Sequence, residues 1–381
     1  MLADAFEPCE LPESAEQLRA DIRTFLADAL KDYPRAHRAH SWMGFSIPFT
    51  KALAARGWVG MIWPAEYGGG NQSALARYVL AEELLAAGAP ILAHWTADRQ
   101  SGPLLLSYGS EAQKNHFLPP ITRGESYFCI GMSEPDAGSD LAATRTRAVR
   151  VEGGWRVTGT KLWTTNAHRC HYMITLVRTS QGSERHQGLT QLIIPLHNEG
   201  VTIRPIYDLA GDSHFNEVVF EDAFVPDDHL VGSEGSGWGQ VMSELAFERS
   251  GPERYLSTVA LLSELIRLVG REPSSAAKAC IGRLVAHISV LRQMSMSVAA
   301  QLDDHKDPSL QAACVKELGT TLEQAMPELI HNLLDAQPSL HSSSDFASVL
   351  AYTMQVAPSF SLRGGTREIL RGVIARGLGL R

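Results

Sequence analysis

The stretch Met132-Ser-Glu-Pro-Asp-Ala-Gly-Ser-Asp140 lies where the periodicity of the sequence changes. Around and beyond it, apolar and polar residues alternate with a period of two, as in Trp155-Arg-Val-Thr158 and Val218-Val-Phe220, and Gly, Asp and Asn turns recur. Alternation of this kind is typical of half-buried strands. We therefore predict a middle β domain over residues 126–235, folded as a small barrel or sandwich.

Helical spacing flanks this strand-rich part on both sides. Before it, apolar residues recur at intervals of three and four over residues 18–26, after a possible capping box at Ser14 and Gln17. After it, the same spacing returns and holds to the C-terminus. We predict an α+β fold with an N-terminal all-α domain over 1–125 and a C-terminal helical bundle over 236–381.

The composition is that of a folded enzyme. Of 381 residues, 44% are apolar and 20% are charged, and the formal charge of −8 includes no basic run that would bind nucleic acid. The opening MLADAFEPCELPES lacks the apolar core of a signal peptide, and no stretch is apolar enough for a membrane span. We expect a cytoplasmic protein. Its five scattered cysteines suggest neither disulfides nor a zinc cluster.

Two motifs on this frame resemble the acyl-CoA dehydrogenase family. The Met132–Asp140 stretch is similar to the family signature at the start of the β domain, and Trp163-Thr-Thr-Asn166 resembles its later W-x-T-N signature. The motifs of the resemblance cover nearly the whole chain. It implies the three-part fold of that family, FAD as cofactor and an acyl-CoA thioester as substrate.

The resemblance also implies which residues contact the flavin. They are Met132 and Ser133 at the isoalloxazine edge, Gly138 and Ser139 at the pyrophosphate, and Trp163 and Thr165 at the ring face and its N5 side. Backbone N–H and hydroxyl groups suit the ring edge and the pyrophosphate, and Trp offers an apolar face for stacking. The alternative is an ordinary Asp/Gly turn with Trp163 in the core.

A glycine turn near the C-terminus precedes a predicted helix. In Gly364-Gly-Thr-Arg-Glu-Ile-Leu-Arg371, the apolar spacing makes Thr366 the helix N-cap. In the family this helix start faces the flavin, whose diphosphate suits free N–H groups at a helix N-terminus. Thr366 and Glu368 are thus expected cofactor contacts, and the alternative for Thr366 is a cap alone.

The resemblance implies a catalytic carboxylate, which takes the α-proton of the thioester while hydride leaves the β-carbon for flavin N5. Many family members place this Glu directly before Gly-Thr, where this chain has Gly364. A second pattern, similar to the isovaleryl and long-chain members, has Glu followed by Arg on the helix after the β domain. Met242-Ser-Glu-Leu-Ala-Phe-Glu-Arg249 fits it. We predict Glu248 as the base and Arg249 as its cationic neighbour; the alternative for Glu248 is a solvated charge.

Glu253 is the competing carboxylate. Ser250-Gly-Pro-Glu253 has the spacing of a capping box, which predicts a structural role for this Glu. Pro252 would clash with the carbonyl of residue 248 in a continuous helix, so we expect a kink or a restart at Ser250.

No metal site is predicted. His168, Cys170 and His171 occupy an alternating segment that we interpret as a strand, and they lack a spaced second pair of ligands. The sequence also contains neither a G-x-S-x-G elbow nor a phosphate-binding P-loop, which argues against a hydrolase or an NTPase.

Two family features are not recognisable. An Arg-x-x-Phe-Gly stretch usually reaches the flavin of a neighbouring subunit, and a Gln…Gly-Gly motif follows it; this chain has residues 266–273 and 334–338 near those places. Without these motifs, the sequence does not support a complete adenosine half of the flavin site or the usual homotetramer.

Three hypotheses follow. The first is an active dehydrogenase that passes electrons to an electron-transferring flavoprotein, as a homo- or hetero-oligomer, dimer or tetramer, including a mixed α₂β₂ assembly. The second is a non-catalytic or half-site subunit of a heterotetrameric acyl-CoA dehydrogenase. The third is a flavin oxidase or monooxygenase on the same fold. The acyl group stays open, from fatty acids to a steroid side chain undergoing β-oxidation.

Overall fold

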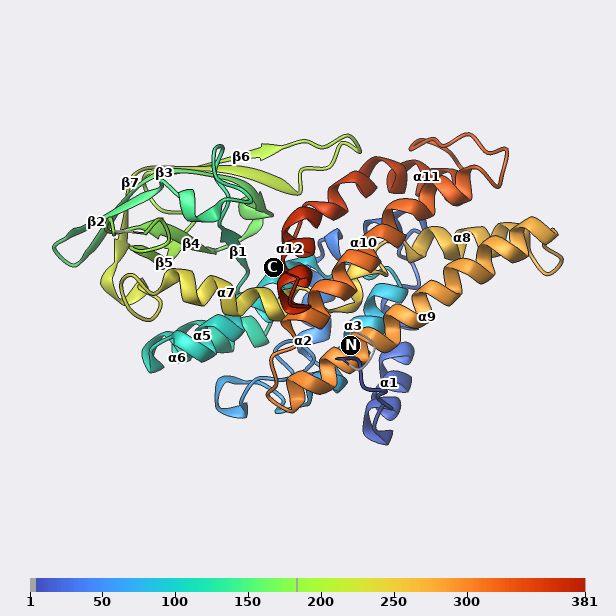
Figure 1. The fold of residues 1–381 in the computed structure, drawn as a ribbon, viewed down its shortest axis with the longest axis horizontal. Coiled ribbons are helices and arrows are strands. Elements are labelled where there is room, and N and C mark those ends of the chain that lie inside the picture. The colour runs from blue at the N-terminus through green and yellow to red at the C-terminus, as the bar shows by residue number, and fades with distance from the viewer. Residues whose placement is uncertain (1–4, 183, 381) are drawn as a thin grey trace. The chain divides into compact units, whose positions relative to one another are not determined.

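The computed structural model describes residues 5–182 and 184–380, and for residues 244–248 it describes the helix but not the side chains. Helices, then strands, then helices follow one another along the chain (Figure 1), which confirms the predicted α+β fold. Contacts divide the chain into two compact units. One consists of Met1–Ser46, Gln72–Leu92 and Ala246–Arg381, and the other of Ile47–Asn71 and Ala93–Leu245. The domain boundaries drawn at 125/126 and 235/236 stay predictions.

A seven-stranded sheet forms the main body of the second unit. Its strands are β1 (Phe128–Gly131), β2 (Arg147–Val151), β3 (Gly154–Thr165), β4 (Tyr172–Arg178), β5 (Leu189–Pro195), β6 (Val201–Ile206) and β7 (Phe215–Pro226). The order is β1-β4-β2-β3-β7-β6, with β5 paired to β4. β1 runs parallel to β4, whereas β3 and β7 form a long antiparallel pair with register shifts at two places.

Short helices accompany this sheet within the same unit. They are α2 (Ile47–Ala54), η3 (Ala65–Tyr67), α4 (Leu92–Thr96), the π-helical η4 (Ala97–Ser101), α5 (Gly102–Tyr108), α6 (Glu111–Thr122), η5 (Leu141–Ala143), η6 (Ala167–Arg169) and η7 (Asp227–His229). A capping box of Ser110 and Gln113 begins α6, and the Gln113 amide also donates to the carbonyls of Asp228 and Leu230, at 2.6 and 2.8 Å. These bonds fasten α6 to the segment that leaves the sheet.

The helix α7 (Gly237–Glu248) follows the Gly- and Ser-rich segment 232–239 and begins inside it. Val241 packs against Leu176 and Leu189 of the sheet, with Trp238 beside them. The start of α7 is therefore anchored on the β unit by apolar burial.

The first unit is a helical assembly. It contains α1 (Glu13–Ala29), η2 (Ala36–Met43), α3 (Ala74–Ala86), η8 (Pro252–Arg254), α8 (Val259–Val269), α9 (Ser275–Asp303), α10 (Ser309–His331), α11 (Asp345–Val356), η9 (Ala357–Ser361) and α12 (Arg367–Gly377). α9 and α10 lie side by side, and α12 packs on α10. Among the described helices, none combines the length and the apolar character that a membrane crossing needs.

Three local predictions were wrong. α1 has Pro12 at its N-cap and no side-chain cap bond, so the capping box at Ser14 does not form. The chain does restart at Pro252 after α7, but Gly251 is the N-cap and the predicted box of Ser250 with Glu253 is absent from this turn. His168 lies in η6, with Cys170 and His171 between η6 and β4, because Asn166 adopts a left-handed conformation that ends β3.

Candidate active site

The signature loop Met132–Asp140 leaves the end of β1 and turns back on itself. Backbone bonds in both directions join Glu134 and Ala137, at 2.8 and 3.2 Å, and close a tight turn. Gly138 and Ser139 follow this turn and are exposed, and a methyl group added at Gly138 would meet nothing within 4 Å. The turn thus presents open backbone of the kind that a phosphate group can approach.

Met132 and Ser133 stand between β1 and this turn, half-buried. The Met132 carbonyl accepts a bond from Lys161 Nζ at 3.0 Å, and the Ser133 carbonyl accepts one from Leu162 N at 2.9 Å. Both partners belong to β3, so one strand carries this segment and also ends in the W-x-T-N motif. The first signature is thus hydrogen-bonded to the two residues of β3 that directly precede the second.

A buried ion pair lies under the loop. Lys161 Nζ is 2.9 Å from Glu134 Oε1, and both side chains are inaccessible or nearly so. Burial lowers the pKa of Lys161 to about 8 despite the attraction of Glu134. Burial alone would raise the pKa of Glu134, but Lys161 and hydrogen bonds from Thr146 and Arg145 bring it below its ordinary value. Periodicity could not reveal this pair, since Lys161 occupies an ordinary strand position.

Trp163 has an unusual conformation for a tryptophan in a strand. Its φ is +61° and its side chain is 55% exposed, at a β-bulge where the β3–β7 register shifts between Lys161 and Thr164. A bulky residue with positive φ is a strained outlier. The alternative interpretation of Trp163 as a core aromatic is therefore wrong: its ring is exposed, and it packs edge-to-face on Phe215 with the two ring centroids 6.0 Å apart.

The rest of the motif offers polar groups. Thr165 is half-buried and pairs with Phe215 of β7. Within the part of the chain that the structure describes, buried Thr164 Oγ1 and Asn166 Nδ2 find no hydrogen-bond partner. Buried polar atoms of this kind normally have partners, so these two groups at the end of β3 are exceptions to that rule.

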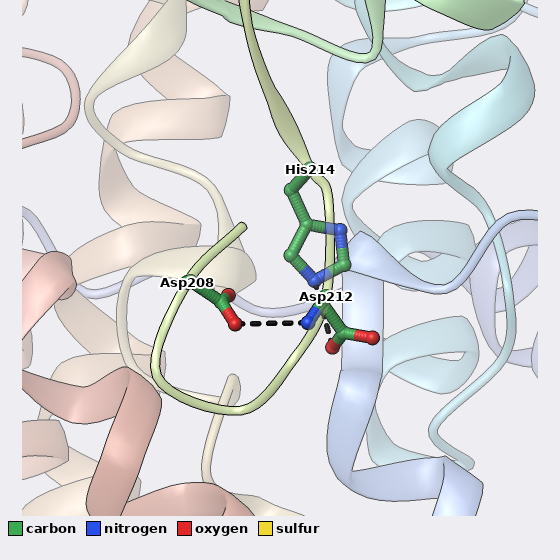
Figure 2. Close-up of side chains that lie close together, drawn as sticks. All are labelled: Asp208, Asp212 and His214. Carbon is green, nitrogen blue, oxygen red and sulfur yellow. Dashed lines mark hydrogen bonds and ion pairs between the residues drawn. The ribbon is translucent and has the colours of Figure 1, made fainter. Parts of the chain in front are cut away.

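The β6–β7 loop brings three potential metal ligands together, Asp208, Asp212 and His214 (Figure 2), with ligand atoms within 4.8 Å of one another. Asp208 Oδ1 accepts the backbone N–H groups of Ala210 and Asp212 at 2.9 and 3.0 Å, and His214 Nε2 lies 3.1 Å from Asp212 Oδ2. This is an Asx-type turn. Its hydrogen bonds account for the geometry, and we assign no ion to it.

The two histidines considered above as metal ligands, His168 and His171, each form a hydrogen bond within the β unit. His168 Nδ1 lies 2.8 Å from Asn216 Oδ1, and His171 Nδ1 accepts the Tyr127 N–H at 3.0 Å. Burial lowers the pKa of both imidazoles. Both rings therefore serve the packing of the β unit.

The helical unit carries the C-terminal motif. Thr366 occupies the N-cap position of α12, as predicted, although its side chain makes no cap bond. Glu368 is exposed in the first turn, where hydrogen bonds from its own backbone N–H and from the Thr366 hydroxyl lower its pKa. The carboxylate and the hydroxyl thus lie together at the helix start.

Two buried cations hold the glycine turn before α12. Arg249 Nε donates to the Gly364 carbonyl at 3.0 Å, and Lys316 Nζ donates to the Gly365 carbonyl at 2.8 Å. The two glycines have φ of +66° and +96°, which favours glycine at both positions. Arg249 is 6% and Lys316 0% exposed. Sequence reasoning identified Arg249 but missed Lys316, whose position in α10 carries no motif.

Glu248 is the last residue of α7, and its side chain lies outside the described residues. Its competitor Glu253 is 2% exposed and lies 3.4 Å from Arg254 Nε. Nearby, Glu323 is fully enclosed, and burial raises its pKa while Arg363 at 3.5 Å opposes that shift. Glu253 is thus buried and paired with a cation.

Comparisons with known proteins agree with this fold and these motifs. The family model described as "Acyl-CoA dehydrogenase, N-terminal domain" matches residues 12–125, and the middle-domain model matches residues 129–223. The chain belongs to the acyl-CoA dehydrogenase family, a family of FAD-dependent oxidoreductases.

Individual relatives bear this out. IpdE1 of Mycobacterium tuberculosis is 33% identical over 97% of this chain and 98% of its own length. FadE34 of the same organism is also 33% identical, but the match spans 45% of that protein. Among solved structures, a Tcur3481-Tcur3483 steroid ACAD superposes with a TM-score of 0.88 at 26% identity, covering 98% of this chain and 100% of that one. The ChsE4-ChsE5 complex of Mycobacterium tuberculosis gives 0.86 at 27% identity, with 98% and 100% covered.

Proposed function

We propose that this chain catalyses the α,β-dehydrogenation of an acyl-CoA thioester to the enoyl-CoA. FAD, when bound, supplies N5 as the acceptor of the β-hydride, and the electrons pass on to an electron-transferring flavoprotein. The observation that carries the proposal is the exposed, strained Trp163 on the strand that also supports Met132 and Ser133. Strain at an exposed aromatic residue is typical of a ligand contact.

The expected flavin contacts fall into two sets. Met132, Ser133, Gly138, Ser139, Trp163 and Thr165 belong to the β unit, and Thr366 and Glu368 belong to the start of α12. The β set offers an aromatic face, backbone donors and an open glycine turn. The residues present therefore suit a flavin with a diphosphate.

Glu248 is the base that we propose. Gly364 carries no carboxylate at the place where many family members have one, and Glu253 is committed to Arg254. Arg249, next to Glu248, is buried and holds the Gly364 carbonyl. The carboxylate must be in its charged form to take the α-proton.

Two isosteric variants test the base. Glu248→Gln should leave FAD bound but slow substrate bleaching of the flavin band by about a hundredfold or more, because the α-proton has no acceptor. Glu253→Gln should retain bleaching and lose stability, about 1–3 kcal/mol, since a buried pair is broken. Anaerobic titration with a panel of acyl-CoA thioesters measures both. Equal loss of bleaching in the two variants would exclude the assignment.

A half-site subunit is the second candidate. The ChsE4-ChsE5 neighbour is a two-protein complex, and this chain lacks a recognisable Arg-x-x-Phe-Gly stretch. We propose an oligomer that includes a second, related chain as the form to look for. Purified protein that stays colourless with added FAD, but turns yellow with a partner chain, would favour this candidate over a self-sufficient enzyme.

For the acyl group we propose only two classes to test, steroid side chains and fatty acids. A steroid ACAD is among the neighbours above 25% identity, so steroid side-chain thioesters belong in the panel beside fatty acyl-CoAs. Oxygen consumption without an electron-transferring flavoprotein would instead indicate an oxidase.

A further inference from the structure

The buried lysine of β3 is the starting point. Lys161 is 0% exposed, and its ammonium group contacts two acceptors of the signature loop, Met132 O at 3.0 Å and Glu134 Oε1 at 2.9 Å. Removing a charge from water is costly, and an apolar pair of similar size would pack as well. Stability alone therefore does not explain why an ion pair is buried at this position.

Glu134 extends the contact across the loop. Its two carboxylate oxygens accept the backbone N–H groups of Arg145 and Thr146, at 2.7 and 2.8 Å, while Oε1 also faces Lys161. The carboxylate thus joins the beginning of the loop to the start of the segment that enters β2. The Glu134 carboxylate thus fixes both the loop and residues 145–146 to the ammonium group of Lys161.

This arrangement sets the direction of one N–H group. The Met132 carbonyl points at Lys161, and the peptide that it shares with Ser133 is trans, since the described chain contains no cis peptide bond. In a planar trans peptide the N–H points opposite to the C=O. The Ser133 N–H therefore points away from the Lys161 ammonium group, and among the described residues no backbone carbonyl accepts it.

We propose that Lys161 and Glu134 are positioning residues, which orient the Met132–Ser133 segment so that the Ser133 N–H can donate to an acceptor on the flavin ring edge. The inference rests on the proposed flavin site. Neither side chain touches the cofactor in this role, because each acts through the backbone that it holds.

Gly131 is consistent with this role. A methyl group added there would lie 3.3 Å from Lys161 Cγ and 2.7 Å from Met173 Cε. The lysine stem thus packs tightly against the strand end that leads into the segment it holds.

The test compares Lys161→Met with the neutral double variant Lys161→Met/Glu134→Gln. The single variant leaves an unpaired buried carboxylate, so both its stability and its FAD affinity should fall. The double variant removes that charge, and its thermal midpoint should recover in part, since the Gln oxygen can still accept one of the two backbone N–H groups. Its FAD dissociation constant should stay raised by about tenfold, because the Met132 carbonyl still lacks its donor.

Gln113→Leu is the matched control. Gln113 is also buried in the β unit and also holds two backbone carbonyls, those of Asp228 and Leu230. It should lower the thermal midpoint and leave the FAD affinity and the flavin absorption bands unchanged. Flavin fluorescence quenching measures affinity, and amide hydrogen exchange of residues 131–146 in FAD-free protein reports the segment itself.

The possible results distinguish a failure of the positioning role from a failure of the proposed flavin function. Faster exchange together with weaker FAD binding in the double variant supports the positioning role. Recovery of FAD affinity along with stability, or unchanged exchange, overturns it. Wild-type protein that binds no FAD, alone or with a partner chain, rejects the proposed function and the flavin role of the pair, while the exchange data still show whether the pair orders the segment.

Discussion

At the residue scale, Trp163 shows how function and local stability oppose each other. Its left-handed backbone costs on the order of 1–3 kcal/mol. The side chain offsets little of this cost through burial, since it is 55% exposed. The bulge persists because β7 pairs on both sides of it and because Asn166 N donates to the His214 carbonyl at 2.7 Å. Surrounding structure thus maintains a conformation that the residue itself disfavours.

We expect Trp163→Asn to keep the free energy of unfolding within about 1 kcal/mol of wild type, because Asn tolerates the left-handed region. FAD binding should weaken, because the stacking face is lost. Urea unfolding and FAD titration check the two parts. In the same strand Trp155→Ala should cost about 3–5 kcal/mol, since Trp155 is 1% exposed. A similar loss at Trp163 would show that its ring has a core role.

At the element scale, the start of α12 depends on groups from other helices. Its N-cap side chain makes no cap bond, and the preceding turn is instead held by Arg249 and by Lys316 of α10. Hydrogen bonds from charged donors are stronger than neutral ones. The position of Thr366 and Glu368 is therefore set by α10 as much as by the α12 sequence.

Lys316→Met should destabilise the protein by about 1–3 kcal/mol, because the Gly365 carbonyl loses a buried donor. Amide exchange should accelerate mainly at residues 364–372. Lys306→Met is the matched control: the Lys306 side chain is 53% exposed and pairs with Asp304 at 3.0 Å, so its loss should change the free energy of unfolding little. Equal effects of the two substitutions would contradict the role of Lys316.

At the scale of the whole molecule, buried charge makes stability depend on pH. The pKa of Lys161 is about 8 in the folded protein and 10.5 for an ordinary lysine. Well below pH 8, Lys161 is protonated in both the folded and the unfolded state. Between these values the unfolded chain binds more protons than the folded one, so this group makes the free energy of unfolding rise with pH, by on the order of 3 kcal/mol or less.

The cost of Lys161→Met should therefore grow from pH 7.5 to pH 10, because only the wild type gains this contribution. Urea unfolding of both proteins at several pH values measures the gap between their free energies of unfolding. The contributions of the other lysines are the same in both proteins and cancel in this gap. A gap that stays constant with pH would mean that Lys161 keeps an ordinary pKa.

The sequence by itself determined the order of helices and strands, the family, and the places of the two signatures and of the Thr366 N-cap. These depend on periodicity and turn chemistry over a few residues, which a chain displays directly. The predicted capping boxes at Ser14 and Ser250 were wrong because Pro12 and Gly251 take the cap positions. The catalytic role of Glu248 stays a prediction.

Only the tertiary structure decided that Trp163 is exposed, that Lys161 lies under the signature loop, and that Arg249 and Lys316 meet at one glycine turn. Lys161 and Glu134 are 27 positions apart, and Arg249 and Gly364 are 115 apart. No local pattern encodes such pairs. They form because a cation that folding buries must find an acceptor, and the acceptor is whichever carboxylate or carbonyl the packed elements bring to it.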